Sequence, residues 1–96
     1  MTRMVWKYLV EEGLFMRKMP KGAQVLSAHI QRGQPQMWVL VNPDEDTDTE
    51  ERQFVAIGTG HRHEILDLSG RFIGTYVYPS KEDVYHLFEI RHQEGE

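Results

Sequence analysis

The stretch RQFVAIGTGHRH, residues 52–63, predicts a buried strand that ends in a glycine-rich turn. Phe54 to Ile57 is a wholly apolar block, which is typical of a strand buried on both faces. Gly58-Thr59-Gly60 then relaxes the ordinary φ/ψ limits, so the chain can turn sharply or approach a ligand closely. Residues 61–63 (HRH) follow at the mouth of this turn. We therefore expect one wall of any binding site to lie here.

Six other segments carry the alternating or β-branched patterns of strands, separated by turn signals roughly every 8–12 residues. These segments are 5–10, 14–19, 23–31, 36–41, 71–78 and 84–90. The third and fourth, joined by the turn RGQP, predict a hairpin. Residues 64–69 (EILDLS) are compatible with one helical turn, and Gly74 predicts a bulge or a close approach. The fold class expected is mostly β: a single compact antiparallel β-sandwich or small barrel of about seven short strands over residues 1–96.

Charge is concentrated in one segment. The net charge is −4, and six of the fifteen acidic residues lie within residues 42–51, which we expect to form an exposed acidic loop. The remaining chain carries nine acids against eleven Lys and Arg and shows no basic stripe, so nucleic-acid binding is not expected. The loop opens like a calcium site with Asp at 44, 46 and 48, but Thr49 and Val55 occupy the places of the required Gly and Glu. A solvated loop is the favoured interpretation.

Composition excludes several classes of protein. The chain has no cysteine, so disulfides, thiolate metal sites and thiol catalysis are ruled out. No apolar run is long enough for a membrane helix, and Lys7 interrupts the only apolar run near the N-terminus, so no secretory signal is expected. We expect a cytoplasmic protein without membrane association, with a frayed polar tail over residues 91–96.

The histidines are the candidates for chemistry. On a strand, His61 and His63 would point the same way and could hold one metal ion, with His86 as a further ligand. The surrounding pattern is too incomplete to predict a metal site. His86 with Glu89, or His61 with Asp67, could form an acid/base pair, although a strand histidine is more often simply hydrogen-bonded within the fold. We predict no catalytic residue, and we expect His63 to face solvent.

Aromatic and basic residues suggest a binding site for a flat, phosphorylated ligand. One or two exposed aromatic rings could stack a purine or nicotinamide, a cationic side chain could meet phosphate, and the GTG turn could offer backbone N–H groups to an anion. The predicted ligand-binding residues are Trp6, Lys7, Trp38, Thr59, Gly60, His61, Arg71 and His86. No cofactor is predicted.

Six motifs in order, VWKY, MPKGAQVLSA, GQPQMWVLVNP, RQFVAIGTGH, FIGTY and HLFE, resemble a family of small phage- and prophage-encoded proteins. The resemblance extends from Trp6 to Glu89, and the family has no assigned activity. Proline usually follows its GTGH motif, so Arg62 and His63 depart from the pattern. The resemblance implies a counter-defence role in a bacterial host's cytoplasm, either sequestering a nucleotide signal or capping a defence protein.

Three functions remain open at this stage. The first is non-enzymatic sequestration of a small nucleotide-like ligand. The second is inhibition of a host protein through an exposed patch or the acidic loop. The third is a small hydrolase that uses His61 and His86. We also expect a homo-oligomer, because residues 5–10 and 84–90 are candidate edge strands that would need protection.

Overall fold

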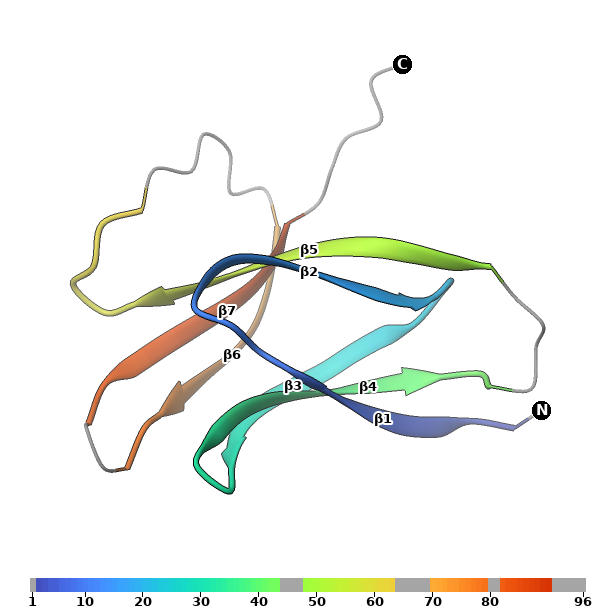
Figure 1. Ribbon diagram of the computed structural model, residues 1–96, viewed down its shortest axis with the longest axis horizontal. Coiled ribbons are helices and arrows are strands. Elements are labelled where there is room, and N and C mark those ends of the chain that lie inside the picture. Colours follow the sequence, from blue (N-terminus) through green and yellow to red (C-terminus); the bar gives the residue numbers. More distant parts are fainter. Residues whose placement is uncertain (1, 44–47, 64–69, 80–81, 91–96) are drawn as a thin grey trace, which may run out of the picture.

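Seven strands form two antiparallel sheets around one apolar core (Figure 1). The computed structural model describes residues 2–43, 48–63, 70–79 and 82–90. One sheet has three strands in the order β1-β4-β3, and the other has four in the order β2-β5-β7-β6. The strands are β1 (Met4–Leu9), β2 (Gly13–Pro20), β3 (Gln24–Gln31), β4 (Gln34–Val41), β5 (Thr49–Gly58), β6 (Arg71–Val77) and β7 (Val84–Ile90).

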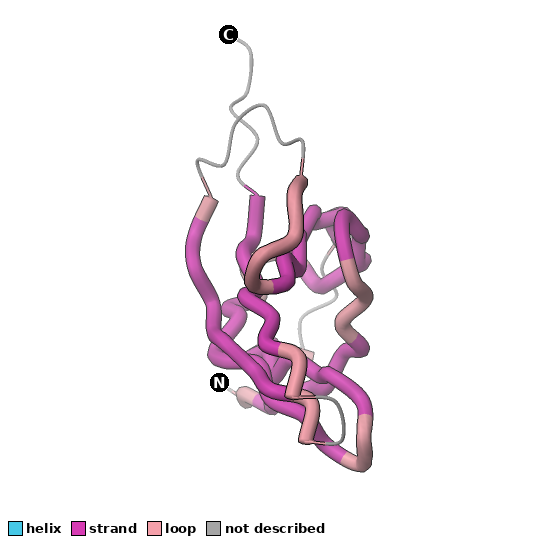
Figure 2. Tube along the Cα trace, turned by 90° about the vertical axis from the view of Figure 1, so that its left-hand side faces the viewer, coloured by secondary structure: helices cyan, strands magenta, loops and turns pink. Residues whose placement is uncertain are grey.

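The predicted fold class is confirmed. Figure 2 shows strands joined by loops, and the described part of the chain contains no helix. Accordingly, none of its segments is a long apolar helix that could cross a membrane. The single helical turn expected at residues 64–69 and the frayed tail expected at 91–96 lie outside the described residues.

β5 is the most deeply buried strand, as its apolar sequence predicts. Phe54, Val55 and Ala56 are fully buried, and β5 pairs with β2 on one side and β7 on the other. The strand begins earlier than expected, because Thr49 already pairs with Pro20. Residues 49–51 therefore belong to β5, and the acidic segment is shorter than the predicted loop.

The predicted hairpin is confirmed as β3 and β4. Its connection is only Arg32-Gly33, and both residues have positive φ angles of 54° and 78°. This conformation matches the right-handed twist of the flanking strands and is the usual one for a two-residue hairpin. Gln34 and Pro35 belong to β4, whereas we had expected them to form part of the turn.

The core lies between the inner faces of the two sheets. Met19, Met37, Val39 and Leu87 are fully buried, and Phe15 stacks on Phe54 at a centroid distance of 5.4 Å. These residues come from both sheets, so burial of their apolar surface holds the sheets together. Close packing of this kind makes the core sensitive to changes in side-chain volume.

The two sheets meet along β3 and β6. The register of β6 shifts between Phe72 and Gly74, which confirms the expected bulge. A Cβ added at Gly74 would lie 3.5 Å from the backbone nitrogen of Ala28 on β3, so the strands touch here. The strands at the other edges of the two sheets, β1 and β2, pack together less closely than β3 and β6 do.

The prediction that residues 5–10 and 84–90 form edge strands is right for the first segment and wrong for the second. β1, within residues 5–10, is an edge strand. β7 is not, because it lies between β5 and β6 and pairs with both. Its apolar sequence reflects burial within the sheet, since Tyr85 and Leu87 belong to the core.

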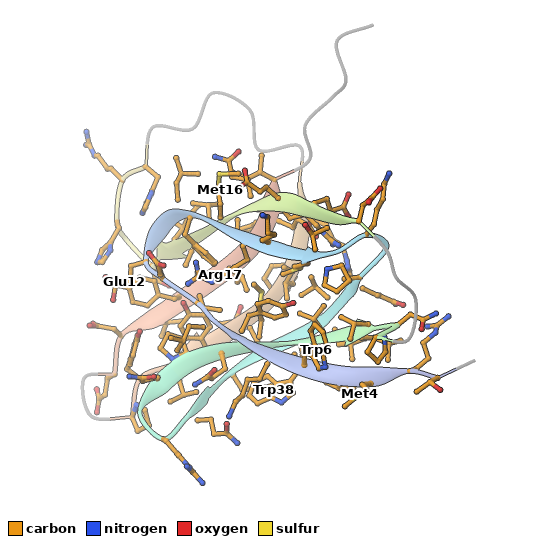
Figure 3. All side chains as sticks on the ribbon, turned by 45° about the vertical axis from the view of Figure 1, so that its right-hand side comes forward. Met4, Trp6, Glu12, Met16, Arg17 and Trp38 are labelled. Carbon is orange, nitrogen blue, oxygen red and sulfur yellow. The ribbon has the colours of Figure 1, made fainter. Side chains whose placement is uncertain are left out.

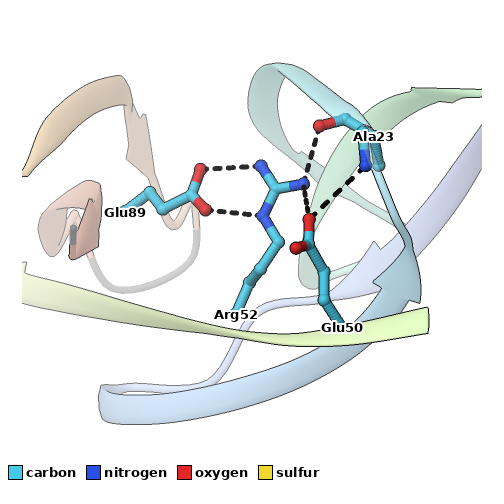
Figure 4. A network of polar contacts seen from close by, with 5 residues as sticks. Ala23, Glu50, Arg52 and Glu89 are labelled. Carbon is cyan, nitrogen blue, oxygen red and sulfur yellow. Dashed lines mark hydrogen bonds and ion pairs between the residues drawn. The ribbon is translucent and has the colours of Figure 1, made fainter. Parts of the chain in front are cut away.

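A buried ion-pair network joins the two sheets (Figure 4). Nε and Nη2 of Arg52 on β5 donate to the two carboxylate oxygens of Glu89 on β7, at 2.7 and 3.0 Å. Nη1 donates to the carbonyl oxygen of Ala23, just before β3, at 2.6 Å, and lies 3.5 Å from Glu50. The side chains of Arg52 and Glu89 are only 15% and 17% exposed. The guanidinium thus satisfies groups from both sheets.

Arg52→Lys is expected to lower the free energy of unfolding by about 1.5–3 kcal/mol, the usual contribution of a hydrogen bond to a charged group. Lysine keeps the positive charge but cannot reproduce the two parallel bonds to Glu89 together with the bond to Ala23. Urea unfolding followed by tryptophan fluorescence measures the change. Arg71→Lys is the control, because Arg71 lines the same hollow but its side chain forms no hydrogen bond with another described residue. Equal effects of the two substitutions would contradict this assignment.

Gly70→Ala should destabilise the fold, by about 1–3 kcal/mol as typical overpacking does. A Cβ at this position would lie only 1.9 Å from the carbonyl oxygen of Glu89, so the backbone would have to move. Gly74→Ala is the matched control, because its Cβ would make only ordinary contacts with Ala28. Thermal unfolding compares the two variants, and an unchanged melting temperature in Gly70→Ala would refute the close approach.

Candidate functional site

The glycine-rich turn brings together three of the predicted site residues. Thr59 Oγ1 lies 2.8 Å from Nε2 of His86, and Thr75 Oγ1 lies 3.0 Å from Nδ1 of the same ring. A hydroxyl can both donate and accept, so His86 can keep both hydrogen bonds whether it is neutral or protonated. Gly60, with φ of 84°, allows the chain to turn beside them. The arrangement fixes the orientation of His86.

His61 folds back onto its own turn. Its backbone N–H donates to the carbonyl of Gly58 at 3.0 Å, and its ring packs edge-on against Tyr85 at a centroid distance of 5.9 Å. The ring covers Gly58 so closely that a Cβ there would lie 2.5 Å from Nδ1. His61 nevertheless remains exposed, and His63 is exposed as we predicted.

The other predicted site residues lie elsewhere. Figure 3 shows Trp6 on β1 and Trp38 on β4. Lys7 pairs in register with Trp38 on the outer face of the three-stranded sheet and donates to Gln31 Oε1 at 2.7 Å. Trp6 is the next residue on β1 and so points to the opposite face. Arg71 lies at the start of β6, in the hollow beside Arg52. The eight predicted residues therefore lie in several parts of the fold and do not form one wall of a single site.

The hollow beside Arg52 has a volume of about 370 Å³, and its carboxylates outnumber its guanidinium groups. Glu50, Glu51 and Glu89 line it together with Arg52 and Arg71. Arg52 is already engaged by Glu89, so only Arg71 remains to attract an anion, and it faces a surplus of carboxylates. The hollow is poorly suited to phosphate.

A second hollow lies between the inner face of β1 and the ends of β2 and β4. We call it the β1–β2 groove; it has a volume of about 280 Å³ and is lined by Trp6, Tyr8, Lys18, Pro20, Asn42, Pro43 and Thr49. Trp6 and Tyr8 pair with the core residues Val39 and Met37, which sets them on the inner face of β1. Trp6 is 37% exposed, because no strand of the other sheet covers it.

The groove adjoins a basic hollow of about 230 Å³, lined by Arg3, Lys21, Gly22, Gln24, Leu40, Val41 and Asn42. Among the described residues, no Asp or Glu lines either space. Arg3, Lys18 and Lys21 form no side-chain hydrogen bond or ion pair with any other described residue. Asn42 lines both spaces, and its Oδ1 is buried without a hydrogen-bond partner among the described residues. Buried polar atoms are normally paired, so this acceptor is unusual.

Sequence reasoning found only one residue of this groove, Trp6. Asn42 and Pro43 were interpreted as the end of a strand, and Lys18 as part of a strand of mixed character. Pro20 and Pro43 each mark the end of a strand, which was a possible signal of the groove. The sequence does not show that these two strand ends meet, because that depends on pairings between distant segments.

Burial also raises the pKa of tyrosine side chains near the β1–β2 groove and near the glycine-rich turn. The pKa of Tyr8 is raised by burial, with the positive charge of Arg52 acting in the opposite direction. Near the glycine-rich turn, Tyr76 stacks on Tyr85 at 5.9 Å, and its hydroxyl is buried without a partner among the described residues. Burial raises the pKa of Tyr76 well above its ordinary value of 10.0, and the neighbouring Tyr78 and the charge of Glu12 raise it further.

Within the described chain, no three His, Asp or Glu side chains lie close enough together to hold a metal ion. Asp44 and Asp46 of the calcium-like pattern lie outside the described residues, as does Asp67 of the possible His61 pair. His86 is held by two threonine hydroxyls, and Glu89, its suggested acid/base partner, is engaged by Arg52. The predicted acid/base pair of His86 with Glu89 is therefore not formed.

Comparison with known protein families gives a match over the whole chain. The family described as "Domain of unknown function (DUF7352)" matches residues 1–96. No curated protein and no solved structure matches the chain significantly.

Tyr76→Phe is expected to preserve or raise the melting temperature at neutral pH, because it removes a buried hydroxyl that has no hydrogen-bond partner among the described residues. It should also weaken the loss of stability at alkaline pH. Wild-type Tyr76 keeps its proton in the folded state above pH 10.0, whereas the unfolded chain releases it, so stability falls as the pH rises past that value. Thermal unfolding between neutral pH and pH about 11 tests both effects. A lower melting temperature at neutral pH would show that the hydroxyl is bonded.

Proposed function

We propose that this chain, which belongs to the family described as Domain of unknown function (DUF7352), is a non-enzymatic binding protein that sequesters a small nucleotide-like ligand in the β1–β2 groove. The observation that carries the proposal is the position of Asn42. Asn42 lines both the groove that contains Trp6 and the hollow that contains Arg3 and Lys21, and its buried Oδ1 has no hydrogen-bond partner among the described residues. A nucleotide has the matching groups: a flat base with N–H donors, joined to phosphate.

The ring of Trp6 supplies the surface for the base. Stacking of a base on an aromatic side chain contributes about 1–3 kcal/mol, whatever the base. Pro20 and Pro43 add apolar surface to the same groove, and Tyr8 adds a phenol. At about 280 Å³ the groove suits one base with its sugar better than a whole dinucleotide.

Cations at the groove supply attraction for phosphate. Lys18 lines the groove itself, and Arg3 and Lys21 line the adjoining hollow. None of these three side chains forms an ion pair with another described residue, and an unpaired cation attracts an anion more strongly than one already paired. This distinguishes the groove from the hollow beside Arg52, where carboxylates are in excess.

Sequestration has more support than hydrolysis. His61 packs against Tyr85, and His86 is bonded to Thr59 and Thr75. Neither histidine lines the β1–β2 groove. A counter-defence role, in which the bound nucleotide is a host signal in the bacterial cytoplasm, is the biological setting that we propose for this binding.

Inhibition of another protein is a second candidate, favoured by a separate observation. Met4, Val5, Trp6 and Leu9 of β1 are all more than a third exposed, which is an unusual density of apolar side chains on one short strand. A host protein could cover this strand. The exposed patch supports this candidate better than the acidic loop, most of which lies outside the described residues.

The test is a thermal-shift and calorimetric screen with AMP, ADP-ribose and a cyclic dinucleotide. A ligand that binds only the folded state raises the melting temperature. Trp6→Leu should weaken binding roughly tenfold or more, as the loss of one stacked base predicts. Trp38→Leu, which removes the other tryptophan from the opposite face of the sheet, should leave binding unchanged.

Lys18→Gln should weaken binding of phosphorylated ligands but not of the corresponding nucleoside, and Lys7→Gln is its matched control. Mass spectrometry of the recovered ligand separates sequestration, which returns it intact, from hydrolysis. The proposal fails if none of the nucleotides shifts the melting temperature, or if the Trp6 and Trp38 variants weaken binding equally.

A further inference from the structure

β1 has backbone groups that point away from its only described partner strand. In the β3–β4 hairpin, Gln31 and Gln34 flank a two-residue turn, so even-numbered residues of β4 bond to β3 and odd-numbered residues face β1. The bond from Val10 N–H to the Pro35 carbonyl, at 3.0 Å, agrees with this alternation. Even-numbered residues of β1 therefore face β4, and Val5, Lys7 and Leu9 face outward.

This outer edge is largely unprotected. At one end, Arg17 of β2 donates to the Leu9 carbonyl at 3.0 Å, and Figure 3 shows Arg17 beside β1. The backbone groups of Val5 and Lys7 have no such partner within the described chain. β1 also contains no proline and no bulge, two features that commonly block pairing at a sheet edge.

The side chains of β1 are also exposed on both faces of the strand. Met4 and Trp6 point to the inner face, where no strand of the other sheet covers them. Val5 and Leu9 lie on the outer face, and each of these four side chains is between 37% and 49% exposed. A strand with free backbone groups and apolar side chains on both faces is suited to pairing with another strand.

We propose that the outer edge of β1 pairs antiparallel with β1 of a second copy of this chain, so that the two three-stranded sheets become one continuous sheet across a two-fold axis. The interface does not depend on the ligand proposed above. It is an isologous contact, in which each copy supplies the same strand.

Backbone alternation limits the register. Only outward-facing residues can exchange hydrogen bonds, so odd-numbered residues must lie opposite odd-numbered residues. Val5 and Lys7 are the two residues whose outward-facing backbone groups have no partner within the described chain. The register that uses both of them places Val5 opposite Lys7 of the second copy, and Lys7 opposite its Val5. Trp6 then lies opposite Trp6 of the second copy, in a non-hydrogen-bonded pair where side chains approach most closely.

Charge favours a second copy as the occupant. β1 is preceded by Arg3 and followed by Glu11, which also accepts a hydrogen bond from Arg17 of its own chain at 2.8 Å, so a cation and a carboxylate flank the two ends of the strand. In the antiparallel register, Arg3 of one copy lies diagonally across from Glu11 of the other. Unlike charges at both ends of the pair stabilise this orientation and disfavour the parallel one.

Light scattering and sedimentation of the full chain without ligand test the proposal. We expect a dimer in the micromolar range that dissociates on dilution. Lys7→Pro should be monomeric, because proline removes an N–H that points outward and leaves the β1–β4 ladder intact. Lys7→Ala is the control, since it also loses the bond to Gln31 but keeps the N–H, and it should remain a dimer.

A second variant keeps the test decisive if Lys7→Pro fails to fold. The chain has no cysteine, so Trp6→Cys introduces a single thiol. Under mild oxidation it should form a disulfide-linked dimer rapidly, because the two Cβ atoms face each other across the axis. Leu9→Cys should not, because in this register Leu9 lies opposite Arg3. A strictly monomeric wild type, or equal cross-linking of both cysteine variants, would overturn the proposal.

The outcomes separate this interface from the nucleotide proposal. Lys7→Pro leaves every residue of the β1–β2 groove unchanged, so a monomer that still binds nucleotide supports both proposals. A wild-type monomer that binds nucleotide overturns the dimer alone. A dimer that binds no nucleotide overturns only the proposed function.

Discussion

The guanidinium of Arg52 is a largely buried charge whose hydrogen bonds link the two sheets. It bonds to both carboxylate oxygens of Glu89 within the four-stranded sheet and to the carbonyl of Ala23 at the entrance to β3. A largely buried charge is tolerated only when its partners are all in place, because an unpaired one is strongly destabilising. The network therefore restricts how β3, β5 and β7 can be placed relative to one another. Apolar contacts alone would specify this placement less narrowly, since they are not directional.

Much of the fold could be predicted from the sequence, because strands and turns are signalled locally. The apolar block Phe54–Ile57 identified the buried strand, and the alternation before Arg32-Gly33 identified the hairpin. The position of β7 could not be predicted. A strand such as VYHLFEI is equally compatible with an edge or a centre, and its pairing with β5 joins segments separated by a long stretch of chain. Nothing in the local sequence specifies whether this strand lies at the edge or in the centre of its sheet.

The candidate site was harder to predict than the fold, for a related reason. Trp6 was identified because an aromatic ring is conspicuous, but Asn42 has an ordinary strand-ending context and becomes notable only when its amide is buried. Thr59 and His86 were both among the predicted site residues, and a hydrogen bond joins them in the structure. Arg71 was predicted to meet phosphate, but the carboxylates around it come from β5 and β7, and its local sequence does not reveal them. A sequence shows how many cationic and aromatic residues the chain has, but it does not show which residues lie next to them in the fold.

The long separation between Arg52 and Glu89 also bears on how the chain is made. The two residues are 37 positions apart, so at ribosomal rates of about 5–20 residues per second Arg52 is synthesised roughly 2–7 seconds before its carboxylate partner. During that interval the apolar centre of β5 lacks β7, and most of the sheet contacts are equally non-local. Folding on the ribosome must therefore await the last strand. Until then the apolar centre of β5 lacks the strand that pairs with it on one side, and unpaired strand edges promote aggregation.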